Sequence, residues 1–301
     1  MRKDNVLEAI GDTPLVEIAR MSPKSEVRIF AKLEGQNVGG SGSVKDRIAK
    51  YMIEKAEESG ELTHDKIILE GTSGNTGIAL AMIGRRKDYR VSIVMPDNAT
   101  KERKQLLELY GAEIILSEGA KGTNGAVELA TKLAEDNRYY MPYQFGNPAN
   151  PLAHYETTGA EIIRDLAGLE IDAFVAGIGT GGTLMGAGRR LKEVFPKIKV
   201  IGVEPHPGEP IAGLRSLAEG FFPPIIDLNL IDERVVVHSA DALARVRELV
   251  NKEGIFCGPS SGAVLHQAIR VAEQMERGVI VCILPDGGWK YLSMPSLGEE
   301  Y

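Results

Sequence analysis

Short apolar runs rich in Val and Ile alternate along this chain with longer stretches whose apolar residues recur at helical spacing. The runs predict buried strands and the longer stretches predict amphipathic helices. The expected strands are Val27–Leu33, Ile67–Glu70, Arg90–Met95, Glu113–Leu116, Ala173–Ala176, Val200–Glu204 and Val279–Leu284. The expected helices are Arg47–Ser59, Asn75–Lys87, Lys101–Tyr110, Gly125–Glu135, Glu161–Leu166, Leu184–Phe195, Ala240–Lys252 and Gly262–Met275. This alternation indicates an α/β fold of parallel sheets with helices on both faces.

Two irregular stretches interrupt the alternation. The turn-rich segment Pro142–Pro151 is a natural crossing point between two α/β sub-domains, and 301 residues are enough for two. The proline-rich segment Glu204–Asp227 is too long for a simple connection, and long loops in compact enzymes are more often functional than idle.

Charge and cysteine content exclude several classes of function. The formal net charge of −7, without a basic stripe, argues against nucleic-acid binding. No apolar run is long enough to cross a bilayer, and the first residues lack a signal-peptide core. The two cysteines, Cys257 and Cys282, have apolar neighbours and no metal-ligand spacing, so we expect buried thiols, no metal and a cytoplasmic location.

Four glycine-bearing segments sit where helices should begin. A helix start with glycine-allowed close approach is an anion site, and one of the four segments also offers a lysine. A ligand with a phosphate, a carboxylate and a carbonyl matches this set, as pyridoxal phosphate joined to an amino acid does. The segments are Gly42–Arg47, Thr72–Gly77, Gly179–Thr183 and Gly258–Gly262.

Taken one at a time, these segments leave alternatives open. Lys45 alone is best explained as an exposed first-turn lysine, although the helix field would also favour a neutral, nucleophilic amine. Thr72–Gly77 holds more small polar residues than a helix cap needs, which favours a carboxylate site. Gly177–Thr183 fits a phosphate loop, but with Glu204 after the next strand it also fits a dinucleotide fingerprint of an oxidoreductase. Its place late in the chain counts against the second interpretation.

Ser260 precedes the last long helix in a segment without a nearby carboxylate. If this hydroxyl faces a pyridine nitrogen, the nitrogen stays largely unprotonated and the ring is a moderate electron sink. That tuning suits loss of a β-substituent better than transamination.

The four segments in this order closely resemble the cysteine synthase and cystathionine β-synthase family of pyridoxal-phosphate enzymes, which have fold type II, the tryptophan synthase β-like fold. The resemblance runs from Ile10–Val16 to Lys290–Ser293. It implies that Lys45 forms the internal aldimine and that Asn75 bonds the cofactor's 3′-oxygen. It also implies a phosphate cradle of Gly179, Thr180, Gly181, Gly182 and Thr183, a ring-nitrogen contact from Ser260, and a substrate-carboxylate site of Thr72, Ser73, Asn75, Thr76 and Gln144.

Within the family, the chain resembles most the cysteine synthase B branch and the O-phosphoserine sulfhydrylases of actinobacteria. The stretches that carry this likeness are Glu102–Gly111, Gly179–Gly186, Glu253–Phe256 and Gly288–Ser293. The resemblance implies that Lys199 and Arg215 read a substrate phosphate. Without it, Arg215 would be a solvated loop arginine and Lys199 a residue at a strand edge.

The chain departs from the family pattern before the lysine and before the Thr72 loop. The segment Asn37–Lys45 is two residues longer than usual and lacks its proline, so we expect a more mobile loop. Gly71 stands where a proline is common.

The resemblance implies a smaller domain of residues 41–145 and a larger one of residues 1–40 with 146–301, with the cofactor between them. The expected reaction makes L-cysteine from O-phosphoserine or O-acetylserine and a sulfur donor, through an aminoacrylate. The donor would be sulfide, thiosulfate or a thiocarboxylated carrier protein, and the enzyme would be a homodimer. The alternatives are a cystathionine β-synthase, a serine or threonine dehydratase, and a non-catalytic binding module.

Overall fold

The computed structural model describes residues 2–72 and 74–294; residues 1, 73 and 295–301 lie outside it. The chain divides into two compact units, the first of Met1–Gly11 with Asn37–Asn150 and the second of Asp12–Gln36 with Pro151–Tyr301. The sequence analysis instead assigned residues 1–40 to the larger domain. The first residues join the first unit because Leu7 is buried in the same apolar cluster as Ala49 and Ile53.

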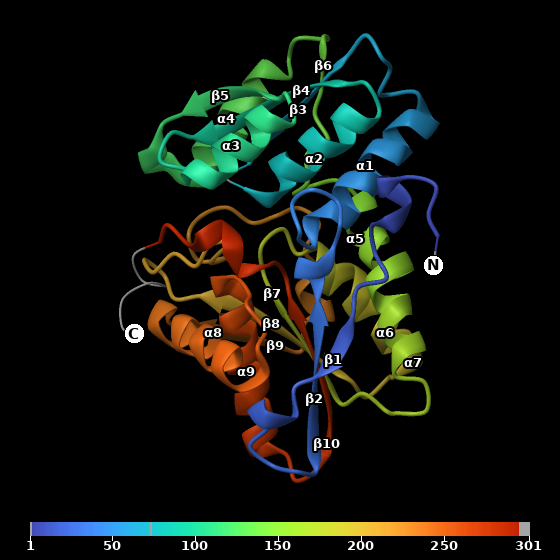
Figure 1. Cartoon of the computed structure of the whole chain (residues 1–301), viewed down its shortest axis with the longest axis vertical. Helices are drawn as coiled ribbons and strands as arrows, with labels where there is room; N and C mark the ends of the chain where they lie inside the picture. Colours follow the sequence, from blue (N-terminus) through green and yellow to red (C-terminus); the bar gives the residue numbers. More distant parts are fainter. Residues whose placement is uncertain (1, 73, 295–301) are drawn as a thin grey trace. The chain divides into compact units, whose positions relative to one another are not determined.

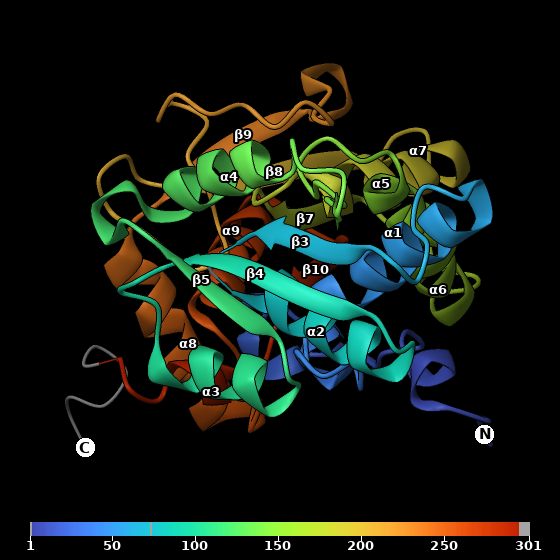
Figure 2. The ribbon, with the colours of Figure 1, turned by 90° about the horizontal axis from the view of Figure 1, so that it is seen from above.

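The first unit is built on a parallel four-stranded sheet in the order β5-β4-β3-β6. Helices cover both of its faces (Figure 2), with α1, α2 and α3 packed on one and α4 on the other. The strands are β3 (Ile67–Gly71), β4 (Arg90–Pro96), β5 (Glu113–Ser117) and β6 (Tyr139–Tyr140). The helices are α1 (Lys45–Ser59), α2 (Asn75–Arg86), α3 (Lys101–Leu109) and α4 (Gly122–Leu133).

The second unit holds a six-stranded sheet in the order β1-β2-β10-β7-β8-β9. Helices α8 and α9 pack on one face, and α6 and α7 on the other (Figure 1). The strands are β1 (Leu15–Glu17), β2 (Val27–Leu33), β7 (Ala173–Gly177), β8 (Lys199–Pro205), β9 (Glu233–Val237) and β10 (Gly278–Leu284). The helices are α5 (Ala149–Ala153, which begins in the first unit), α6 (Ala160–Asp165), α7 (Arg189–Val194), α8 (Ser239–Glu253) and α9 (Pro259–Gln274).

The structure confirms the α/β class and contains all seven expected strands. It adds β1, β6 and β9, which are short or partly exposed and lack a long apolar run. The edge strand β1 runs antiparallel to β2, so the larger sheet is not purely parallel.

Two segments adopt π-helical geometry, which the sequence analysis did not expect. His154–Gly159 (η5) leads into α6, and Leu184–Gly188 (η6) leads into α7 where one uniform helix was expected. The two π segments pack against each other, and a Cβ at Gly186 would lie 2.0 Å from the Pro151 carbonyl oxygen and 2.7 Å from His154 Cβ. Single π turns inside helices occur often at functional sites.

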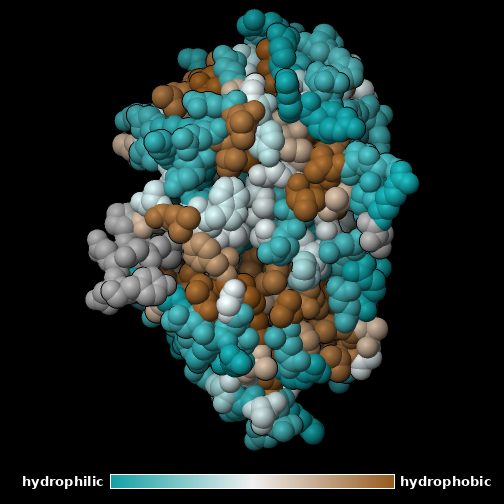
Figure 3. Space-filling view, in the orientation of Figure 1, coloured by the Kyte–Doolittle hydropathy of each residue, from teal (hydrophilic) through white to brown (hydrophobic). Residues whose placement is uncertain are grey.

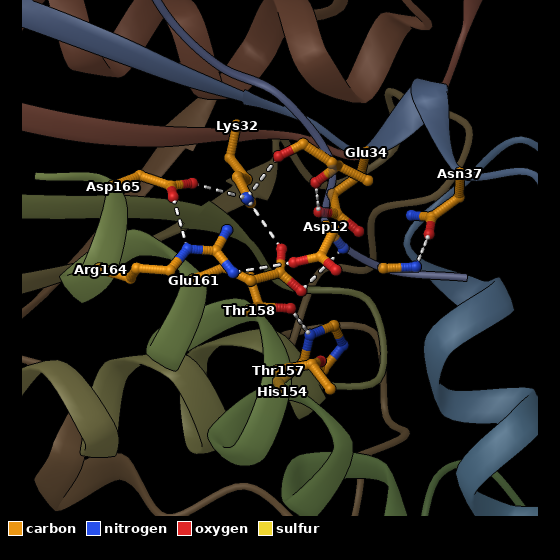
Figure 4. Close-up of polar contacts among 12 residues, drawn as sticks. Asp12, Lys32, Glu34, Asn37, His154, Thr157, Thr158, Glu161, Arg164 and Asp165 are labelled. Carbon is orange, nitrogen blue, oxygen red and sulfur yellow. Dashed lines mark hydrogen bonds and ion pairs between the residues drawn. The ribbon is translucent and has the colours of Figure 1, made fainter. Parts of the chain in front are cut away.

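A buried lysine anchors β2 in the second unit (Figure 4). Lys32 is fully buried, pairs with Glu161 at 2.8 Å and donates to the Thr13 carbonyl oxygen at 2.6 Å. Asp165 lies 3.6 Å from the same ammonium. These partners offset the cost of burying the charge and tie β2 to α6.

On the face seen in Figure 3, hydrophilic residues predominate toward the edges, and hydrophobic residues gather in patches nearer the middle. Among the described residues, none of the helices is both long enough and apolar enough to traverse a bilayer.

Candidate functional site

Lys45 is the first residue of α1, and the carboxylate of Asp46 organises the loop that leads to it. Asp46 is buried and accepts from the Ser41 hydroxyl at 2.7 Å and from the backbone N–H groups of Ser41 and Ser43 at 3.1 Å each. Ser43 Oγ in turn accepts from the backbone N–H of Lys45 at 3.1 Å. Gly40 and Gly42 take positive φ angles of 89° and 54°, which the tight path requires. The longer loop is therefore closed by defined hydrogen bonds, and Lys45 stands half-buried at its end.

The segment Thr72–Gly77 connects β3 to α2, as the sequence predicts. Thr72 Oγ1 accepts from the Gly74 N–H at 3.2 Å, and α2 begins at Asn75. Gly74 has no side chain with which to cap this helix, and the backbone N–H groups of a helix start favour an anion. Ser73, the remaining candidate in this segment, lies outside the described residues.

Position 71 holds glycine, where the family commonly has proline, and there is a steric reason for the glycine. A Cβ at this position would lie 2.6 Å from the Ala126 carbonyl oxygen and 2.7 Å from Val127 Cα. Both atoms are backbone atoms of α4, so a side chain here would push α4 away from the sheet.

Gln144 lies beside Thr76, although 68 positions separate them. Thr76 Oγ1 donates to Gln144 Oε1 at 2.6 Å, and both residues are buried. Gln144 follows Tyr143, which has a positive φ of 53°, and its carbonyl oxygen accepts from Asn150 Nδ2 at 2.7 Å. Two of the predicted carboxylate-binding residues are thus brought together and held in place.

Glu70 is a buried acid at the end of β3 that the sequence analysis did not single out. Burial raises the pKa of this carboxyl to about 8, and the backbone N–H groups of Gln144 and Tyr143 partly oppose the rise. Glu70 is therefore protonated at neutral pH, directly before the Thr72 loop.

Arg103 on α3 is a second residue that sequence reasoning missed. A Cβ at Gly74 would lie 3.2 Å from Arg103 Nε, so the guanidinium lies over the Thr72–Gly77 segment. Arg103 is half-buried, not fully exposed to solvent. Its guanidinium is a charge-assisted donor of the kind that pairs with carboxylates and phosphates.

In the second unit, the residues Gly179 to Thr183 follow β7 and lead directly into η6. Thr180 Oγ1 accepts from the Gly182 N–H at 3.3 Å, and Gly181 has a φ of 92°. Thr183 Oγ1 lies 3.3 Å from Nε2 of the buried His154. His154 Nδ1 lies 2.9 Å from the Thr158 hydroxyl oxygen (Figure 4). Backbone amides and hydroxyls at a helix start form the donor set that a phosphate needs.

Ser260 is buried in the first turn of α9, and Gly213 links it to the glycine-rich loop. A Cβ at Gly213 would lie 3.4 Å from Ser260 Oγ, and one at Gly179 would lie 2.7 Å from the Gly213 carbonyl oxygen. The second unit therefore gathers the predicted phosphate and ring-nitrogen residues.

The segment that holds Ser260 contains no carboxylate, but the structure brings one to its first residue, Gly258. Asp286 follows β10, and a Cβ at Gly258 would lie 2.2 Å from Asp286 Oδ1. Asp286 Oδ2 accepts from the Tyr291 hydroxyl at 2.7 Å and pairs with the buried Lys290 at 3.5 Å. The acid is close in space because the end of β10 returns to the start of α9, which sequence spacing cannot reveal.

Lys199 and Arg215 are not brought together, contrary to the paired phosphate-reading role that the resemblance implies. Lys199 begins β8 opposite Ala173 and is exposed, at the amino end of the sheet. The Arg215 N–H donates at 2.7 Å to Ile178, beyond the carboxyl end of β7. Five residue steps along the strand, about 16 Å, separate these levels. Lys199 belongs to the opposite end of the sheet from the glycine-rich loop.

Arg215 lies half-buried in the irregular segment. Its guanidinium carbon lies 4.6 Å from the centre of the Phe221 ring. Burial lowers the pKa of this guanidinium, and Glu219 partly restores it.

Both cysteines are buried, as the sequence predicts. Burial raises the pKa of each thiol to about 12, so neither is a thiolate nucleophile at neutral pH.

The residues present fit pyridoxal phosphate. One unit offers a half-buried lysine at a helix start and a hydroxyl- and amide-rich loop, and the other offers a phosphate-type loop and a buried hydroxyl. Each set matches a chemical part of that cofactor or of an amino acid bound to it.

Comparison with known proteins agrees with this fit. The family model described as "Pyridoxal-phosphate dependent enzyme" matches residues 6–286. The chain is 44% identical to cysteine synthase B of Salmonella typhimurium over 298 residues, covering 99% of this chain and 97% of that protein. It is 41% identical to a cysteine synthase of Staphylococcus aureus over 300 residues, covering 97% and 96%.

Among solved structures, that of O-ureido-L-serine synthase matches with a TM-score of 0.93 at 38% identity, covering 100% of this chain and 97% of the other. Family model, curated relatives and solved structure agree over nearly the full length. The chain belongs to the pyridoxal-phosphate dependent enzyme family, in its fold type II cysteine synthase group.

Proposed function

We propose that this chain catalyses a β-replacement that makes L-cysteine from an activated serine and a sulfur donor. The observation that carries the proposal is Lys45, half-buried at the first residue of α1 and approached by a loop that Asp46 closes. The two cysteine synthases with 41% and 44% identity support the same reaction.

We assign the cofactor contacts to both units. The backbone amides of Gly179 to Thr183 bind the phosphate, Ser260 meets the ring nitrogen, and Asn75 bonds the 3′-oxygen. When bound, pyridoxal phosphate supplies a ring that withdraws electrons from the substrate's Cα. A serine rather than a carboxylate at the ring nitrogen keeps that withdrawal moderate, and Asp286 remains engaged by Tyr291 and Lys290.

We assign the substrate carboxylate to Thr72, Ser73, Asn75, Thr76 and Gln144. The Thr76–Gln144 hydrogen bond fixes two of these groups before substrate arrives, which lowers the entropic cost of orientation. Lys45 Nζ takes the proton from the substrate's Cα and returns it after the sulfur nucleophile has added at Cβ.

We further propose O-phosphoserine as the preferred substrate, with O-acetylserine as the alternative. This preference is supported by Arg215 and not by Lys199. The Arg215 backbone N–H donates to the carbonyl oxygen of Ile178, the residue before Gly179 in the proposed phosphate loop. A guanidinium that binds a phosphate in a partly desolvated place contributes about 1.5–3 kcal/mol. Arg215→Ala should lower kcat/KM for O-phosphoserine about ten- to hundredfold and spare O-acetylserine. Lys199→Ala is the matched control and should change neither.

The decisive experiment combines colour and turnover. The wild-type protein should be yellow, lose its colour with borohydride and release cysteine from O-phosphoserine or O-acetylserine with sulfide. Lys45→Ala should lose the borohydride-reducible cofactor and turnover, whereas Lys50→Ala on the same helix should keep both. Release of pyruvate without sulfide would favour a dehydratase, and a preference for homocysteine would favour a cystathionine β-synthase.

Two assembly questions follow from the same proposal. We propose a homodimer, which light scattering of the purified protein would test. Sulfide is the proposed donor, and a comparison with thiosulfate and a thiocarboxylated carrier protein would rank the three.

A further inference from the structure

Two histidines and one glutamate gather in the second unit, apart from every residue assigned above to cofactor or substrate. His206 directly follows β8 and His238 directly follows β9. The two strands pair in parallel with Pro205 opposite Val237, and the His206 N–H donates to the Val237 carbonyl oxygen at 2.9 Å. The two histidines therefore leave neighbouring strand ends side by side, and their rings stack with centroids 4.5 Å apart.

Glu209 reaches both imidazoles. Its Oε1 lies 2.9 Å from His238 Nδ1 and 3.6 Å from His206 Nδ1. Its other oxygen, Oε2, accepts from the backbone N–H of Ser239 at 3.1 Å and from the Ser239 hydroxyl at 3.2 Å. The carboxylate is thus fixed at the start of α8 with one oxygen turned toward the histidines.

The two imidazoles share one acidic partner. His238 Nδ1 lies beside Glu209 Oε1, while His206 Nδ1 donates to the Pro207 carbonyl oxygen at 2.9 Å. Two imidazole nitrogens and one carboxylate oxygen form a set of nitrogen and oxygen ligands that suits a divalent transition metal.

Two of the three separations between these atoms are close to those between ligands of one metal ion. The three ligand atoms all lie within 4.8 Å of one another. Ligands about 2.1 Å from a tetrahedral ion stand about 3.4 Å apart, and the measured separations of 2.9 and 3.6 Å lie on either side of that value. The side chains are 55%, 44% and 37% exposed for His238, His206 and Glu209, so water can fill the remaining positions.

We propose that His206, Glu209 and His238 form a binding site for a divalent transition metal of the zinc class. The ligand atoms are the two Nδ1 nitrogens and Glu209 Oε1, with water completing the shell. Each imidazole gives up its Nδ1 proton on binding, and the exposed rings turn about χ2 out of the stack. Residue spacing alone hides this site, because 32 positions separate the histidines; the strand pairing brings them together.

A metal at this site would restrict the movement of the irregular segment that follows β8. Glu209 lies near the beginning of that segment, and Ile226 near its end contacts the position of a Cβ at Gly181. A metal would tie the segment to the start of α8 through His238. Arg215 lies between these two ends.

Zinc titration of the untagged, cofactor-loaded protein by isothermal calorimetry tests the proposal. Wild type should bind one equivalent of Zn²⁺, and His206→Ala and His238→Ala should each weaken binding at least tenfold. His266→Ala, a partly exposed histidine on α9, is the matched control and should bind as wild type does. Co²⁺ should give a visible d–d absorption that both ligand variants lose.

Absence of Zn²⁺ binding to wild type, or equal binding by the double histidine variant, would overturn the site. Glu209→Gln covers a folding defect in the histidine variants, because it keeps the shape and removes the charge. It should also weaken Zn²⁺ binding at least tenfold, and wild-type affinity would overturn the three-residue assignment. The readout is metal binding, so it is independent of the proposed reaction.

Discussion

Thr76 donates a 2.6 Å hydrogen bond to Gln144, which joins the start of α2 to the segment that leaves the first unit. The bond is buried, and the Gln144 carbonyl oxygen is held separately by Asn150. The Gln144 amide nitrogen can then donate to a substrate.

Breaking this pair should separate binding from chemistry. Gln144→Ala removes the amide and should raise KM for the amino-acid substrate about tenfold while the cofactor colour persists, because one buried hydrogen bond is worth about 1 kcal/mol and an amide donor is also lost. Thr76→Val, which keeps the shape, should raise KM less. Spectral titration with the amino acid measures both, and loss of cofactor in either variant would contradict the assignment to substrate.

Glu70 should make stability fall as pH rises. The folded protein holds the proton up to a pKa of about 8, whereas the unfolded chain releases it near the usual value of 4.5. Between these values the native state binds more protons, so its stability decreases with pH by at most about 1.4 kcal/mol per pH unit. Glu70→Gln should flatten that slope in urea unfolding at several pH values between 5.5 and 7.5.

The exposed Glu118→Gln serves as the control for Glu70 and should leave the slope unchanged. Equal slopes in wild type and Glu70→Gln would mean that Glu70 ionises normally.

Asp46 should be needed to position Lys45. Asp46→Asn replaces an acceptor oxygen with an amide that faces the Ser43 N–H, so it should cost about 2 kcal/mol and slow turnover more than it weakens substrate binding. Thermal unfolding and steady-state kinetics measure the two effects. Glu58→Gln, exposed on the same helix, should behave as wild type. Unchanged kcat in Asp46→Asn would remove the positioning role.

Gly181→Val should lower cofactor affinity more than backbone strain alone explains. Gly181 has a φ of 92°, and a Cβ there would lie 2.4 Å from Ile226 Cγ1. Gly220→Val carries similar strain, with a φ of 85°, but meets no atom within 4 Å. Fluorescence titration with pyridoxal phosphate should show at least a tenfold weaker Kd for Gly181→Val alone, and equal losses would assign the effect to strain.

The parts of this fold that depend on a local sequence pattern could be predicted from the sequence. Buried strands such as β10 are continuous apolar runs, and their bounds follow directly from composition. β9 was missed because it lies at the sheet edge, begins with the two charged residues Glu233 and Arg234, and has only three apolar residues after them. The π-helical segments were missed because their geometry comes from the close contact at Gly186, not from residue propensity.

The candidate site likewise contains residues that a local sequence pattern predicts and residues that it does not. Lys45 and the Gly179–Thr183 loop were visible as contiguous motifs at helix starts. Glu70, Arg103 and Asp286 were not, because each acquires its role from a neighbour distant in sequence. Lys199 shows the converse: a matching residue type at a plausible position lies at the wrong end of its strand.

The paired π segments determine how the helices that continue from them are rotated about their own axes, and therefore which side chains face the core. Each inserts extra backbone into a turn, and an α-helix advances about 100° per residue. Removing one residue between His154 and Gly159 would therefore rotate all of α6, moving the buried Ile162 off the core and Glu161 away from Lys32. The number of residues in this stretch is therefore constrained by the packing of α6, and homologous chains that keep the fold must add or delete residues elsewhere.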